Sequence, residues 1–314
     1  MNDYIFSYTN IVDGLESLAN AYLFAGHMDE AVHLAHQGLE ILEANQAEQQ
    51  ELIRGLLLYG TMLNKQSFMI ANHFDKAVVL LERAQNLAEQ PADLVLQASV
   101  LMQLGMAHDQ HKLIRDEGDY ETAMGYFQKA MQKFEQANDQ VGIGRAFFNI
   151  GLIHQRWQQR EEAEVNFSQA LEIAQQQDEK LDMSLAYRHR GFFHTLEGEW
   201  DIARYYAEES LRLREEIGCR YLLSPAHHVL GLVHNDMGDK EAALSHYYIA
   251  FNLAETLNLK LFMLQPLFAL SDWHQEAQAQ QQARTFAQRA LDVAQELNYR
   301  RSIEAAIRKI EILS

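Results

Sequence analysis

Residues 147–170 read FFNIGLIHQRWQQREEAEVNFSQA, and this stretch contains two apolar patterns separated by a polar segment. Apolar or small residues recur at helical spacing from Phe147 to His154, and again from Ala163 to Ala174. Such spacing places them on one face of an amphipathic helix. The small residues Gly151 and Ala163 allow the two helices to approach closely. The stretch therefore predicts a helix–turn–helix unit.

This unit recurs along the chain with a fixed period. Four alanines lie forty residues apart, and each stands twelve positions after a small residue. The alanines are Ala163, Ala203, Ala243 and Ala283, and the small residues are Gly151, Gly191, Gly231 and Ser271. A period of roughly 20 to 50 residues is typical of stacked units that each pack only on their neighbours. The sequence therefore predicts an all-α repeat array.

Seven units and a closing helix account for the chain. We expect repeats at residues 11–45, 50–90, 94–137, 140–177, 180–217, 221–257 and 261–297, all within one domain of residues 1–314. Residues 299–313 are apolar on one face and basic on the other, which predicts a capping helix.

The pattern of a large residue, Ile150-Gly151 and a ring at His154, followed by Ala163, Phe167 and Ala170, resembles the tetratricopeptide repeat (TPR). That repeat usually spans about 34 residues. The period of forty and the missing terminal proline are similar to the long-repeat branch of the family. The resemblance implies a right-handed α-solenoid in which the first helix of each unit lines a concave groove.

The amino-acid composition argues against some classes of function, nucleic-acid binding above all. The net charge is −18, with 44 acidic and 26 basic side chains, so the average surface repels nucleic acid and anionic lipid. A single cysteine, Cys219, cannot form an internal disulfide. The start of the chain lacks a signal-peptide pattern, and charged or amide side chains interrupt every apolar run. We expect a cytoplasmic protein that binds neither nucleic acid nor membranes.

The candidate binding site follows from the resemblance, which places three positions of each first helix on the concave face. Apolar, amide and arginine side chains occupy these positions, and Asn149 matches an asparagine that holds a ligand backbone in related repeats. The candidate residues are Met102, Met106, Arg145, Phe148, Asn149, Leu152, Gln155, Arg188, Phe192, His228, Leu232 and Asn235. An exposed apolar strip favours a partner site. The alternative is that these side chains pack on neighbouring repeats.

Two repeats carry extra residues between their helices. The spacing from glycine to alanine is 17 in the second repeat (60 to 77) and 18 in the third (105 to 123), against 12 elsewhere. The added segments, 65–74 and 108–119, include apolar side chains at Phe68, Met69, Ile70, Leu113 and Ile114. We expect this lengthened corner to contact a partner or a second copy of the chain.

Histidine occupies one repeat position five times, at His108, His154, His194, His234 and His274. A metal ladder is one interpretation; the favoured one is that the rings fill a position normally held by tyrosine between helices. The sequence contains no His-Glu-x-x-His, Cys-x-x-Cys or Gly-x-Ser-x-Gly motif. We therefore predict no catalytic residues, no metal site and no cofactor.

These observations favour a non-enzymatic scaffold that captures a protein or peptide segment in the concave groove. The alternative is a bacterial regulatory sensor that binds a short signalling peptide or a response regulator. An enzyme is the least favoured class.

Overall fold

The computed structural model describes residues 2–70, 74–88 and 93–313, with the side chains of residues 2–8 and 70 excepted. All regular structure in these ranges is helical, which confirms the all-α class and the succession of paired helices. The first four pairs are α1 (Asn2–Ala25) and α2 (Met28–Ala44), α3 (Gln49–Ile70) and α4 (Phe74–Ala88), α5 (Leu94–Arg115) and α6 (Tyr120–Ala137), and α7 (Gln140–Arg156) and α8 (Arg160–Gln176).

Three further pairs and a single helix complete the described chain. They are α9 (Lys180–Glu197) and α10 (Trp200–Glu216), α11 (Leu223–Asp236) and α12 (Lys240–Thr256), α13 (Lys260–Glu276) and α14 (Gln280–Glu296), and the last helix α15 (Arg300–Ile312). A short 3-10 turn, Arg220–Leu222, precedes α11. The seven pairs and the closing helix match the predicted repeats, except that α1 begins nine residues before the expected start at residue 11.

The backbone between helices repeats every twenty residues. From Gly118 onward, a residue with positive φ recurs every twenty residues: Gly118, Asn138, Gln158, Asp178, Gly198, Gly218, Gly238, Asn258, Gln278 and Asn298. The connection that contains Gly118 has a second such residue, Asp116. Such a left-handed residue ends a helix sharply, and glycine, asparagine and aspartate adopt it most readily. Each helix with its turn therefore takes half of the forty-residue repeat.

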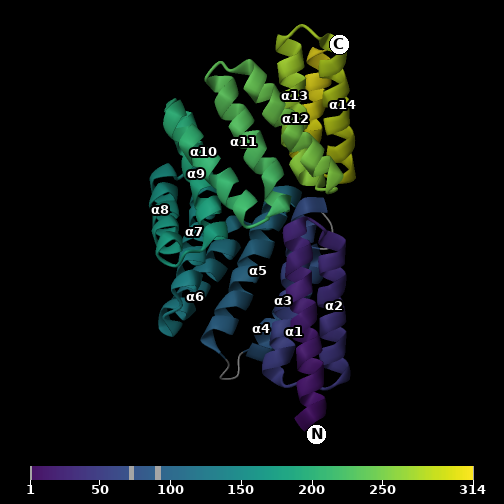
Figure 1. Ribbon diagram of the computed structural model, residues 1–314, viewed down its shortest axis with the longest axis vertical. Coiled ribbons are helices and arrows are strands. Elements are labelled where there is room, and N and C mark those ends of the chain that lie inside the picture. Colours follow the sequence, from purple (N-terminus) through teal and green to yellow (C-terminus); the bar gives the residue numbers. More distant parts are fainter. Residues whose placement is uncertain (1, 71–73, 89–92, 314) are drawn as a thin grey trace. The chain divides into compact units, whose positions relative to one another are not determined.

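Two compact units divide the chain: Met1–Phe68 with Asn72–Asp178, and Met69–Ala71 with Glu179–Ser314. In the first unit, α5 to α8 pack as successive neighbours and α5 also contacts α7. In the second, helices α9 to α15 follow one another as packed neighbours (Figure 1), and α11 contacts both α9 and α13. The first helices of adjacent repeats thus lie side by side within each unit. The single domain expected from the sequence stays a prediction.

The added residues of the second and third repeats lengthen helices instead of forming loops. Both α3 and α5 have 22 residues, whereas the first helices α7 and α13 have 17. Met69 and Ile114 are each only 3% exposed, which corrects the expectation of an apolar surface built from all the corner side chains. The side chain of Ile70 lies outside the described residues. Self-association at this corner stays a prediction that rests on half-buried Phe68 and Leu113.

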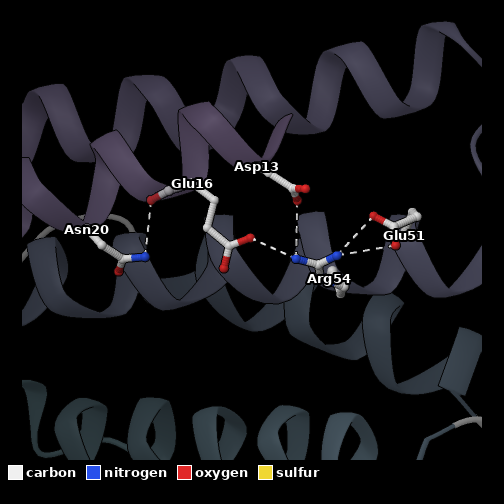
Figure 2. A network of polar contacts seen from close by, with 5 residues as sticks. All are labelled: Asp13, Glu16, Asn20, Glu51 and Arg54. Carbon is white, nitrogen blue, oxygen red and sulfur yellow. Dashed lines mark hydrogen bonds and ion pairs between the residues drawn. The ribbon is translucent and has the colours of Figure 1, made fainter. Parts of the chain in front are cut away.

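Charged side chains join α1 to α3 in the first unit (Figure 2). The Arg54 guanidinium lies 3.2 Å from Glu16, 3.5 Å from Asp13 and 3.3 Å from Glu51. Burial lowers the pKa of Arg54, but the surrounding carboxylates, Glu51 foremost, outweigh that effect and raise it. One cation thus holds together the acidic edges of two first helices. No helix among the described residues is long and apolar enough to cross a membrane.

Candidate functional site

Helices α5 and α7 carry the first-unit members of the candidate groove. Asn149 on α7 is 8% exposed, and its side-chain amide donates to the Arg145 carbonyl oxygen at 2.8 Å and to the Met102 sulfur of α5 at 3.5 Å. Met102 is itself buried, at 5% exposed. The structure brings these three residues together, with the Asn149 amide hydrogens bonded inside the protein. A ligand that used this amide would have to displace one of those contacts.

The other first-unit candidates are more accessible. Arg145 is exposed, and Met106, Phe148, Leu152 and Gln155 are half-buried. The Phe148 ring contacts the fully buried Phe167 ring of α8, with centroids 5.5 Å apart. Phe148 therefore belongs partly to the core between the two helices of its repeat.

An ion pair between first helices was not among the sequence candidates. Asp109 of α5 is 6% exposed and lies 3.5 Å from the Nε of Arg156 of α7. Burial raises the pKa of Asp109, and Arg156 opposes that shift. Asp109 stands four residues after Gly105 of α5, and Arg156 stands five residues after Gly151 of α7. Only a comparison of these positions in neighbouring first helices could have suggested this pair.

Two apolar candidates in the second unit face solvent. Phe192 of α9 is 44% exposed and Leu232 of α11 is 39% exposed. They occupy the same repeat position, forty residues apart, on helices that contact each other. Leu196, one turn after Phe192, is 62% exposed and was not among the sequence candidates. These three side chains are the most accessible large apolar groups on the described first helices α9, α11 and α13.

The polar candidate side chains of the second unit, Arg188, His228 and Asn235, interact with other groups of the protein. His228 is 6% exposed, and burial, together with the Arg188 guanidinium, lowers its pKa to about 3. Half-buried Arg188 donates from Nη1 to His189 Nε2 at 3.0 Å. The Asn235 side-chain oxygen accepts from Lys240 Nζ at 2.8 Å. Phe192 and Leu232 are thus the members of this set with free apolar surface.

Four of the five repeated histidines pack on the second helix of their own repeat, whereas His154 meets the Trp157 ring edge-on. Stacked ring pairs form between His108 and Tyr126, His194 and Tyr206, His234 and His246, and His274 and Phe286. Interplanar angles of 11° to 18° indicate parallel rings. Stacking between the helices of one repeat agrees with the packing interpretation of these histidines.

One group of three side chains, His194, Glu197 and Glu199, is close enough to meet a metal ion among the described residues. His194 Nδ1 lies 2.6 Å from Glu199 and 3.9 Å from Glu197. The first of these contacts recurs without a glutamate, as His154 Nδ1 lies 2.6 Å from the Gln159 side-chain oxygen. A repeated bond across the turn between helices therefore explains the arrangement without a metal.

A family model and a curated relative each match part of this chain. A family model described as the tetratricopeptide repeat matches residues 112–176. The transcription activator GutR of Bacillus subtilis (strain 168) is 27% identical over 157 residues, which are 48% of this chain and 17% of GutR. The chain thus spans only a small part of that relative.

Solved structures share the fold at low sequence identity. A Rap protein complexed with competence and sporulation factor has a TM-score of 0.71 and 16% identity, over 94% of this chain and 80% of that one. NprR in complex with its cognate peptide NprX has a TM-score of 0.64 and 15% identity, over 95% and 83% of the two chains. Both similarities concern the fold.

Proposed function

We propose that this chain, a tetratricopeptide repeat protein, is a non-enzymatic scaffold that binds a segment of another protein on the face of its first helices. The observation that supports it most is the pair Phe192 and Leu232, which repeat one position on adjacent helices and remain 44% and 39% exposed. Isolated exposed apolar residues are common on proteins. A recurring, contiguous set on one face favours a partner.

The chemistry of this face suits an extended or helical peptide. Phe192 and Leu196 are one helical turn apart, so an apolar ligand side chain can insert between them and reach Leu232 on α11. Rigid aromatic anchors of this kind contribute most of the binding energy in many interfaces. The hydroxyl of half-buried Thr195 donates to the Gly191 carbonyl oxygen and can still accept a hydrogen bond from a ligand backbone N–H.

A regulatory sensor for a short signalling peptide is the second candidate function. The two solved structures with the same fold were each determined with a bound factor or peptide, and this favours the sensor among alternatives. In that case the ligand would be a free peptide and not a segment of a larger protein. The same apolar side chains would hold it.

Replacement of Phe192 tests both candidates. Because the ring is largely exposed, Phe192→Ala should leave the melting temperature nearly unchanged while weakening the partner by about 2 kcal/mol, or roughly 30-fold. Tyr205→Ala is the matched control, since Tyr205 is an aromatic residue that is 54% exposed on the second helix α10. Affinity capture from native lysate followed by calorimetry with the captured protein, or with peptides derived from it, measures the effect.

The outcomes separate the possibilities. Equal loss of capture in both variants, or none in either, would contradict binding at Phe192. A large fall in melting temperature for Phe192→Ala would mean that the ring supports the fold. Saturable binding of a free peptide favours the sensor, whereas binding only of the intact partner favours the scaffold.

A further inference from the structure

The closing helix α15 occupies the place of a first helix in an eighth repeat. It packs on α14 as α13 packs on α12. Ala306 and Leu313 are buried, at 0% and 3% exposed, and Ile310 packs against the core residues Ala283 and Ala287 of α14. One side of α15 is thus anchored to the seventh repeat.

A second apolar edge of α15 has no helix over it among the described residues. Ile307 stands forty residues after Leu267 of α13, yet Ile307 is 41% exposed whereas Leu267 is 0% exposed. Ile303 stands forty residues after Met263, which is 8% exposed, and is itself half-buried. Positions that are buried in α13 are therefore more accessible in α15.

Four exposed charges border this edge and alternate in sign. Arg300, Glu304, Arg308 and Glu311 are all exposed. At 100° per residue they fall within about 80° of one another around the helix, directly beside Ile307 and away from the buried Ala306. Arg300 and Glu304 already pair along the helix at 2.8 Å.

This edge is complementary to itself when it is reversed. In an antiparallel copy Arg300 faces Glu311, and Glu304 faces Arg308. The same reversal sets Ile307 opposite Ile307, and it sets Ile303 opposite the part of half-buried Ile310 that α14 leaves uncovered. The centres of the four pairs fall between residues 305 and 307, within about 2 Å of one another along the helix, so one two-fold axis near residue 306 serves both rows.

We propose that α15 is a docking surface for a second copy of this chain, which pairs through its own α15 in antiparallel orientation about a two-fold axis. Opposite charges at the border would fix the orientation, and the isoleucines would supply the buried area. A helix of 13 residues is about 20 Å long and buries less than a standard interface of roughly 1,600 Å². The resulting dimer is expected to be weak and to form as the concentration rises.

Sedimentation velocity of the full chain over a concentration series tests the pairing. The wild type should shift from monomer toward dimer, and Ile307→Glu should weaken association by at least about 10-fold because it places two carboxylates at the two-fold axis. Ile249→Glu is the matched control, because Ile249 is 38% exposed on α12 of the same unit. It should dimerise like the wild type, and unchanged circular dichroism should establish that both variants fold.

Charge exchange tests the antiparallel orientation. Glu304→Arg should weaken the dimer, because the new side chain would face Arg308 of the copy. Adding Arg308→Glu to that variant should restore it, because the exchanged charges face each other again. A wild type that stays monomeric at all concentrations, a dimer indifferent to Ile307→Glu, or a double variant as weak as the single one would each overturn the proposal.

Discussion

The histidine at position 228 illustrates how burial sets the chemistry of a single side chain in this protein. Two other repeats carry phenylalanine at the same position, as Phe148 and Phe268, and the preceding repeat carries Arg188. His228 is 6% exposed, and its Nδ1 is buried with no hydrogen-bond partner among the described residues. The neutral ring therefore fills a place that other repeats fill with an apolar one.

Stability is accordingly predicted to fall in mild acid through this residue. The pKa of His228 is about 3 in the folded protein, against 6.5 for an unperturbed histidine, because burial and Arg188 disfavour the charged ring. Above pH 6.5 the ring is neutral in both states and contributes nothing to the pH dependence. As pH falls below 6.5 only the unfolded state gains the proton, so stability is lost, by about 2 kcal/mol at pH 5.

His228→Phe removes this titration and should make stability less dependent on pH between 7 and 5. Urea unfolding of wild type and variant at both pH values measures the difference. Any packing change from the larger ring alters stability equally at both pH values, so the slope isolates the proton. An identical pH dependence in the two proteins would refute the buried-neutral assignment.

Glycine residues determine how closely the two helices of a repeat approach each other. A Cβ added at Gly231 of α11 would lie 2.5 Å from the Tyr247 ring and 3.3 Å from the Ala243 carbonyl oxygen of α12. Tyr247 is 3% exposed and has no room to withdraw. By contrast, a Cβ added at Gly125 of α6 would meet no atom within 4 Å.

These two glycines are predicted to respond in opposite directions to alanine. Gly231→Ala should destabilise the protein by about 1 to 3 kcal/mol, because the paired helices must move apart. Gly125→Ala should stabilise it by up to about 1 kcal/mol, because alanine favours a helix interior. Chemical denaturation of both variants measures the changes, and destabilisation by Gly125→Ala would show that helix propensity does not govern that site.

The second feature of the individual elements is the length of helices α3 and α5. The surplus residues of the second and third repeats extend α3 and α5 and bury Met69 and Ile114. Sequence spacing located the surplus but gave no sign of whether it formed loops or helix. The apolar spacing of both segments continues that of the preceding helix, and this signal would have predicted a longer helix.

Net charge acts at the scale of the whole molecule. With a net charge of −18, the protein should repel the phosphate backbone of duplex DNA at long range. We predict no measurable complex by gel shift at physiological salt. A micromolar complex that weakens steeply with salt would contradict the charge argument.

The sequence by itself determined the periodic part of this protein. Small residues at forty-residue spacing dictate where paired helices touch, because only glycine, alanine or serine permits that approach. The same period located the seven pairs, the closing helix and the stacked histidines. Connections with left-handed residues were less evident, because glutamine occupies three of them.

Tertiary structure alone decided which side chains of the first helices remain accessible. Met102, Asn149 and His228 occupy candidate groove positions yet are buried, whereas Phe192 and Leu232 are exposed. Exposure of a residue depends on the side chains that neighbouring helices direct toward it, from 19 residues away for Phe148 and Phe167 to 47 for Met102 and Asn149. Periodicity assigns a residue to a helix face, but the contacts between helices determine how much of that face is left for a partner.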